Sequence, residues 1–128
     1  MKQYRKHTRI LLDLAAEIKS TDGTVYRGRT KNISFGGVFF KKSRLTALKQ
    51  DEKCNFSIIL SEGTEGLSIE FDSEVVHIRK TGVGLRFASI KGTDAYHHFK
   101  NLMVMNSPDP DKLLEELELH PGIILHNN

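Results

Sequence analysis

The chain has little cysteine and no long hydrophobic run, and each absence excludes a class of protein. Cys54 is the only cysteine in 128 residues, which excludes an internal disulfide and a cysteine-based zinc site. A transmembrane helix needs roughly 18 or more apolar residues in succession. No stretch of that kind is present, so a transmembrane helix is excluded.

A secretory signal is also missing. Asp13 and Glu17 interrupt the apolar residues that follow the basic N-terminus, whereas a signal peptide needs an unbroken apolar centre. Together with the single cysteine, this favours a reducing setting. We therefore expect a cytoplasmic protein.

Patterns typical of enzymes and metal sites do not occur either. The chain has no nucleophile elbow, Walker loop or paired-carboxylate motif. His97 and His98 are adjacent, so on a helix they would point about 100° apart, and they lack partners at metal-ligand spacing. Ser34 has no His–Asp arrangement suited to nucleophilic attack. We expect no catalysis, no metal and no cofactor.

The composition suits one globular domain, but its charge is unevenly distributed. Hydrophobic residues make up 38% and charged residues 27%, and the net charge is +3. Residues 1–9 hold four Lys or Arg and no acidic residue, whereas residues 109–118 hold five acidic residues and one lysine. The basic segment indicates an anionic partner, although two solvated charged ends would give the same pattern.

Between residues 11 and 91, apolar and polar residues alternate in short runs, which predicts half-buried strands. Asp22-Gly23 and Thr81-Gly82 are turn signals between such runs. The predicted strands cover residues 12–18, 24–34, 38–40, 56–60, 67–71 with an extension over 75–79, and 83–87. About six short strands followed by helices predict a mainly β fold, a small antiparallel barrel with a helical C-terminal appendage.

After Gly92 the apolar residues fall at helical spacing as far as Asn106. Thr93 or Asp94 is predicted to cap the first turn of this helix. Its end is predicted at Ser107-Pro108-Asp109-Pro110, because proline disfavours helix in the residue before it.

A second short helix is predicted to open at Asp111, with an apolar face of leucines, and to end at His120-Pro121-Gly122. For residues 123–125 two alternatives remain open. They pack back on the body of the domain, or they belong to a frayed terminus.

Two short motifs point to ligand chemistry. Arg5 and Arg9 form an Arg-x-x-x-Arg motif just before the first strand, and a guanidinium can both grip phosphate oxygens and stack on a flat ring. The second motif is Asn32-Ile33-Ser34-Phe35-Gly36-Gly37. Its polar side chains can meet a base edge, and its glycines allow a ligand to approach the backbone. Taken singly, the motifs also suit a solvated basic tail and a tight turn.

Together the two motifs resemble the signature of the PilZ domain family, Arg-x-x-x-Arg followed by Asp/Asn-x-Ser-x-x-Gly. Gly82-Val83-Gly84-Leu85-Arg86-Phe87 is similar to a third family feature, a Gly-x-Gly-x-x-Phe strand, and the resemblance spans residues 4–106. It implies a six-stranded β-barrel that binds cyclic di-GMP. This chain has Asn32 where many members have Asp, and we expect binding to survive with altered strength.

The resemblance also implies a role for each motif residue. Arg5 and Arg9 would contact the phosphates and one guanine of cyclic di-GMP, since arginine pairs with guanine O6 and N7. Asn32 and Ser34 would reach the other guanine, with Gly36 and Gly37 leaving room for it.

Four further residues are weaker candidates for the same site. Lys6 would add a phosphate contact, or is a basic surface residue without a role. Tyr4 favours one bound ligand over a stacked pair. His77 and Arg79 face one side of a strand by alternation, where they would support the ligand or form an ordinary exposed surface.

The sequence thus predicts a single PilZ-like domain over residues 1–128. Its parts are a flexible ligand-binding segment (1–10), a barrel (11–91) and C-terminal helices (93–119). Ligand binding would order residues 1–9 and change the surface offered to an unknown protein partner. By resemblance, that partner would belong to motility, biofilm or secretion.

Two alternatives from other classes remain at this point. A small basic barrel can bind single-stranded nucleic acid, with Tyr26, Phe39 and Phe40 as stacking platforms, although the acidic C-terminal segment opposes it. A ligand-independent adaptor would instead dock through the leucine face of residues 111–119.

Overall fold

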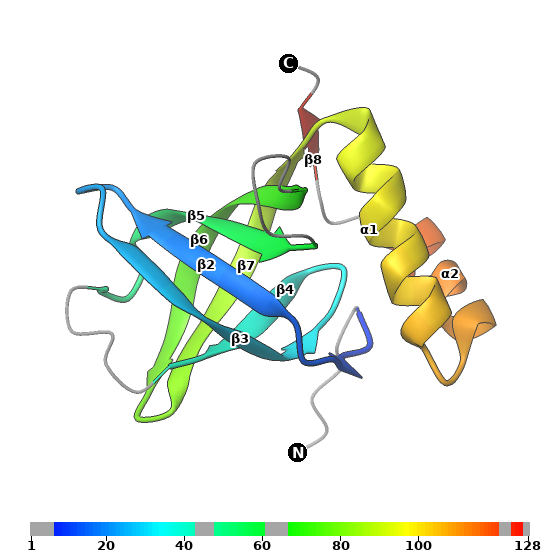
Figure 1. Ribbon diagram of the computed structural model, residues 1–128. Coiled ribbons are helices and arrows are strands. Elements are labelled where there is room, and N and C mark those ends of the chain that lie inside the picture. The colour runs from blue at the N-terminus through cyan, green and yellow to red at the C-terminus, as the bar shows by residue number, and fades with distance from the viewer. Residues whose placement is uncertain (1–6, 43–47, 61–66, 121–123, 127–128) are drawn as a thin grey trace.

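The computed structural model describes residues 7–42, 48–60, 67–120 and 124–126. These residues form strands first and helices afterwards, with one short strand near the C-terminus (Figure 1). The strands are β1 (Ile10–Leu11), β2 (Ala15–Ser20), β3 (Val25–Ile33), β4 (Gly37–Lys41), β5 (Lys53–Ile59), β6 (Ser68–Arg79), β7 (Gly82–Lys91) and β8 (Ile124–His126). The helices are α1 (Thr93–Asn106) and α2 (Pro110–Leu119).

Six of the strands close into an antiparallel barrel, which confirms the predicted fold. Neighbours follow the order β3-β2-β5-β6-β7-β4, and β4 pairs back with β3 to complete the circle. Because the barrel is closed, each of the six strands pairs with a neighbour on both sides. Strand β1 pairs with the end of β3 beyond β2, and β8 pairs with β7 in parallel.

The first hairpin shows how a local signal sets the register of the barrel. Gly23 has a φ of 89°, and the Asp22 carboxylate accepts hydrogen bonds from the Ser20 hydroxyl and from the Thr24 N–H. The hydroxyl bond, followed by those from Thr24, lowers the pKa of Asp22 to about 2. The predicted Asp22-Gly23 turn is therefore confirmed.

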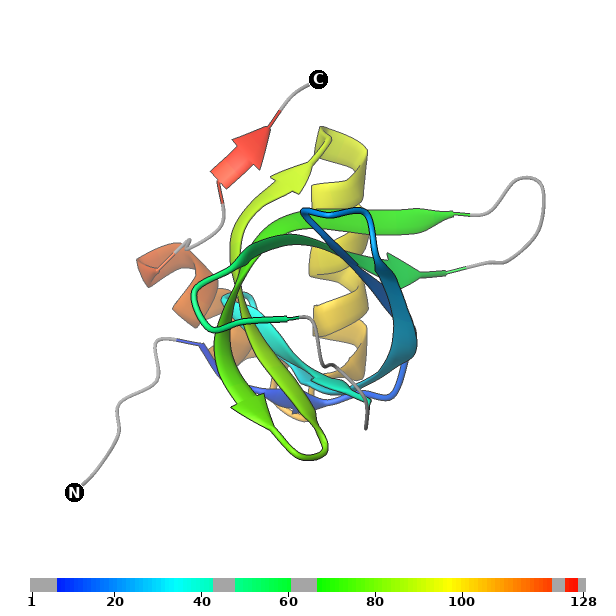
Figure 2. The same ribbon diagram turned by 90° about the vertical axis from the view of Figure 1, so that its left-hand side faces the viewer.

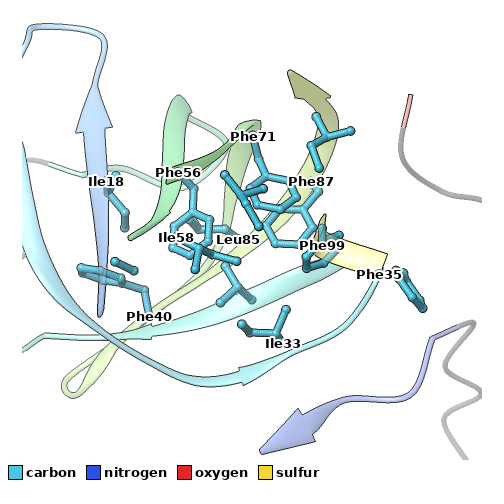
Figure 3. Packing of buried hydrophobic residues seen from close by; sticks show 14 of the residues in the cluster. Ile18, Ile33, Phe35, Phe40, Phe56, Ile58, Phe71, Leu85, Phe87 and Phe99 are labelled. Atoms are coloured by element: carbon cyan, nitrogen blue, oxygen red, sulfur yellow. The ribbon is translucent and has the colours of Figure 1, made fainter. Parts of the chain in front are cut away.

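The core is rich in phenylalanine and extends from the barrel into α1 (Figure 3). The rings of Phe71 and Phe87 stack with centroids 4.1 Å apart, and Phe56 lies 5.9 Å from each. Phe99 of α1 meets Phe71 edge to face at 4.9 Å. Seen along the barrel, α1 lies behind it and covers its far end (Figure 2). No helix in the described part of the chain is long and apolar enough to cross a membrane.

The predicted cap of α1 is wrong. The helix begins at Thr93, its N-cap is Gly92 with a φ of 97°, and no side chain caps it. Thr93 and Asp94 already lie inside the first turn, where their side chains do not replace the cap. A sharp turn out of β7 requires the glycine at this position, because positive φ is strained for other residues.

The predicted start of α2 is one residue late. The helix begins at Pro110, and the Asp109 carboxylate caps it by accepting the Lys112 N–H at 3.1 Å. Proline suits the first helical position because its fixed φ is helical and its missing N–H is not needed there. At the C-terminus, Ile124–His126 pairs with β7, so the packed alternative is correct for Ile124 and Leu125, whereas residue 123 lies outside the described residues.

We predict that Phe99→Ala lowers the free energy of unfolding by about 3 kcal/mol or more, because it leaves a cavity between α1 and the barrel. Phe99 is fully buried, whereas Met105 on the same helix is 83% exposed, so Met105→Ala is the matched control. Urea denaturation measures both. A loss below about 1 kcal/mol in Phe99→Ala would show that α1 does not share the barrel core.

We also predict that Cys54 is inert in the folded protein. Burial, and secondarily the charge of Glu52, raises the pKa of the Cys54 thiol to about 12. Because the thiolate is the reactive form, a thiol reagent at pH 8 should react at least about a hundredfold more slowly with native than with denatured protein. Equal rates would contradict the buried placement of Cys54.

Candidate functional site

A row of four outward-facing residues crosses four neighbouring strands of the barrel. Asn32 of β3 lies opposite Phe39 of β4, Phe39 lies opposite Gly84 of β7, and Gly84 lies opposite His77 of β6. Gly84 has no side chain, and a Cβ placed there would lie 3.1 Å from Cδ2 of His77. The His77 ring therefore packs over Gly84, and all four residues of the row line one hollow in the surface.

A β-bulge turns His77 toward this row. The pairing with β7 shifts between Val75 and His77, which makes Val76 the extra residue. Val75 is buried and His77 is exposed, although simple alternation would put both on one face. Arg79 shares this face with His77, as alternation predicted, but it lies further along β6 and does not line the hollow.

The turn between β3 and β4 forms one wall of the hollow. The Ser34 hydroxyl oxygen accepts hydrogen bonds from the N–H groups of Gly36 and Gly37, each at 3.1 Å. A Cβ on Gly37 would lie 2.2 Å from the carbonyl oxygen of Leu85, so β4 and β7 approach too closely for any side chain there. In this structure Ser34 holds the turn, and Gly37 permits the strand contact.

These walls enclose a cavity of about 270 Å³. It brings Arg9 of the first predicted motif together with the second motif from a distant part of the chain. Its lining residues are Arg9, Asn32, Ser34, Gly36, Gly37, Val38, Phe39, Val76, His77, Gly84, Leu85 and Arg86.

Strand β1 brings the N-terminal motif to the cavity. Ile10 pairs with Ile33 and Leu11 pairs with Asn32, so Arg9 enters beside the polar end of the row. Arg9 is exposed and lines the cavity. The predicted residues Tyr4, Arg5 and Lys6 lie outside the described residues.

Arg86 and Phe39 are lining residues to which the sequence analysis gave no part in this cavity. Arg86 follows Gly84 by two positions, so strand alternation places it on the same face and would have indicated it. Its guanidinium forms an ion pair with Glu74 at 2.8 Å. The Lys31 ammonium lies over the Phe39 ring, 5.9 Å from the ring centroid. The cavity is therefore edged by cations and contains a flat apolar surface, which suits an anionic aromatic ligand.

The nucleic-acid alternative depends on aromatic residues that the structure mostly buries. Phe40 is fully buried and Tyr26 is 7% exposed, so neither is a stacking platform. Their side chains point into the barrel because they alternate with outward neighbours. That part of the sequence analysis is wrong.

A larger cavity, of about 610 Å³, lies over β2, β5, β6 and β7 and contains none of the predicted site residues. Size alone therefore does not mark the site. Across the described part of the chain, no three His, Cys, Asp or Glu side chains are grouped to hold a metal ion.

Comparison with known proteins assigns the family. The PilZ domain family model matches residues 3–103, which is well over half of the chain. The chain therefore belongs to the PilZ domain family. No curated protein matches it.

Solved structures of similar fold agree with this assignment. YcgR of Escherichia coli in complex with c-di-GMP aligns with a TM-score of 0.61 and 20% identity over 88% of this chain and 50% of YcgR. The Bacillus subtilis inhibitor of motility MotI/DgrA gives 0.59 and 22% over 75% of this chain and 48% of MotI. The PilZ domain of CeSA from a cellulose-synthesizing bacterium gives 0.54 and 18% over 63% of this chain and 80% of that domain. The chain thus spans about half the length of YcgR and MotI.

We predict that Ser34→Ala destabilises the fold by about 1–2 kcal/mol, because the N–H groups of Gly36 and Gly37 lose their acceptor. Ser68→Ala, at an exposed serine of β6, is the control and should change the free energy of unfolding by less than about 0.5 kcal/mol. Urea denaturation compares the two. Equal stability of both variants would contradict the structural role of Ser34.

Proposed function

We propose that this chain is a cyclic di-GMP receptor whose ligand occupies the cavity around Gly84. The observation that carries the proposal is the meeting of Arg9 with Asn32, Ser34 and His77 around one hollow. Membership of the PilZ family and the similar fold of YcgR, solved with c-di-GMP, support it.

The chemistry of the lining fits the ligand. Cyclic di-GMP carries two phosphates and two guanines, and an arginine fork matches both a phosphate and the O6/N7 edge of guanine. The Asn32 amide both donates and accepts, so it can pair with a base edge. The rings of Phe39 and His77 offer flat surfaces for stacking.

The size of the cavity limits what it can enclose. About 270 Å³ is at the lower end of small-molecule sites, which commonly span about 300–1,000 Å³. The cavity therefore takes one guanine and the adjoining phosphate, and the arginine segment covers the remainder. Arg5 acts from that segment, Lys6 adds a phosphate contact, and Tyr4 restricts binding to a single ligand.

The proposed role is regulatory rather than catalytic. Ligand binding strengthens the attachment of the N-terminal segment to the barrel and changes the surface that the protein presents to another protein in the cytoplasm. A change in how firmly a short segment is held is a common form of molecular switch. The partner would belong to motility, biofilm formation or secretion.

We predict that cyclic di-GMP binds with a stoichiometry of one and that Arg5→Ala and Arg9→Ala each weaken binding at least about tenfold. Each variant loses charge-assisted hydrogen bonds worth about 1.5–3 kcal/mol apiece. Isothermal titration calorimetry measures the affinity. Arg27→Ala is the matched control, because Arg27 is exposed and pairs with Glu17 away from the cavity.

Two results would reject the proposal. The first is the absence of binding by the wild-type protein at hundreds of micromolar ligand. The second is wild-type affinity in both arginine variants. Tight, salt-dependent binding of an oligonucleotide without any response to cyclic di-GMP would instead support a nucleic-acid protein.

A further inference from the structure

The segment that carries Arg9 is bonded to α2, at the opposite end of the sequence. The Thr8 N–H donates to Glu116 Oε1 at 2.7 Å, and the Thr8 hydroxyl donates to Glu116 Oε2 at 2.6 Å. Both carboxylate oxygens of Glu116 therefore accept hydrogen bonds from the same residue, Thr8. In Figure 2 the N-terminal segment, in dark blue, runs beside α2, in orange.

His7 extends this contact to the wall of the cavity. Its Nε2 is hydrogen-bonded to the carbonyl oxygen of His120, just after α2. Its ring meets Phe35 edge to face at 6.4 Å, and Nδ1 lies 2.9 Å from the place a Cβ would take on Gly36. His7 is thus held between the end of α2 and the turn formed by the second motif.

Glu116 is not required to attach α2 to the domain. Leu113 and Leu117 are 1% and 7% exposed and anchor the helix through apolar packing. The carboxylates of Asp111, Glu115 and Glu118 on the same helix are exposed. Among the acidic residues of α2, Glu116 alone is half-buried against the N-terminal segment.

We infer that Glu116 is a positioning residue for the ligand site. By fixing Thr8, it holds the adjoining Arg9 at the cavity before the ligand arrives, which reduces the ordering cost of binding. Hydrogen bonds to a charged carboxylate are stronger than those between neutral groups, so Glu116 by itself is enough to fix Thr8. The effect on the ligand rests on the proposed function, whereas the contact between Thr8 and Glu116 does not.

The inference links the ligand site to α2. If the docked segment favours the ligand, the ligand must favour the docked segment by the same free energy. Bound cyclic di-GMP therefore strengthens the attachment of the N-terminal segment to α2. Ligand binding at the cavity thereby changes the contacts of α2, although this helix is distant from the cavity residues in the sequence.

The first test compares three variants at one helix. Glu116→Ala should weaken cyclic di-GMP binding about five- to tenfold in calorimetry, the effect of one or two lost hydrogen bonds. Glu116→Gln should recover most of the affinity, since its amide accepts from the Thr8 N–H and donates to the Thr8 hydroxyl. Glu115→Ala, which removes the same charge from an exposed position, should bind as the wild type does.

A double-variant cycle separates positioning from general destabilisation. Thr8→Val removes the hydroxyl contact, so adding it to Glu116→Ala should weaken binding less than about twofold further. Additive losses in the double variant would mean that the two residues act independently. That result, or wild-type affinity in Glu116→Ala, would overturn the inference.

The last test needs no ligand. NMR exchange of the Thr8 amide should be at least about tenfold faster in Glu116→Ala and unchanged in Glu115→Ala, because the amide loses its acceptor. Unchanged exchange in Glu116→Ala would remove the contact on which the inference depends. If exchange accelerates but the wild-type protein does not bind cyclic di-GMP, the proposed function fails, and with it the ligand role of Glu116, while the contact itself stands.

Discussion

The close approach of β4 to β7 is the constraint on which the rest of the structure depends. A Cβ on Gly82 would lie 1.9 Å from the Phe40 carbonyl oxygen, and one on Gly37 would lie 2.2 Å from that of Leu85. Only glycine, which has no Cβ, permits two backbones to approach this closely. The two contacts allow β4 to join β3 to β7 and close the barrel. Closure in turn sets Asn32, Phe39, Gly84 and His77 in a single row, which forms the floor of the candidate site.

Another glycine, Gly84, and the Ser34 turn shape the candidate site on the convex outer face of the barrel. Such a face normally presents side chains to solvent without a hollow. Here Gly84 lets the His77 ring pack close to the backbone of β7, and the Ser34 turn forms a wall of the cavity beside it. The core inside is filled by phenylalanine rings, so the barrel supports the site as a rigid base.

The two C-terminal helices have different roles, because α1 packs on the core and α2 also contacts the N-terminal segment. Helix α1 completes the core through Phe99, and its removal would open the end of the barrel. Helix α2 attaches through leucines but reaches the ligand side through Glu116 and the carbonyl of His120. One acidic residue of the C-terminal end, Glu116, thus holds a residue of the N-terminal end, although its partner Thr8 is neutral.

Local patterns in the sequence determined the strands and helices, the Asp22-Gly23 turn and the family motifs, because each depends on residues a few positions apart. The six-stranded barrel followed from them, since hairpin spacing leaves few ways to pair consecutive strands. Element ends were less accurate: Gly92 and Pro110 set the helix starts by backbone preferences that side-chain periodicity does not reveal. Only the tertiary structure decided the bulge that exposes His77 and the bond between Thr8 and Glu116. Those features arise from pairings between segments up to 108 residues apart, and no single stretch of sequence contains both partners.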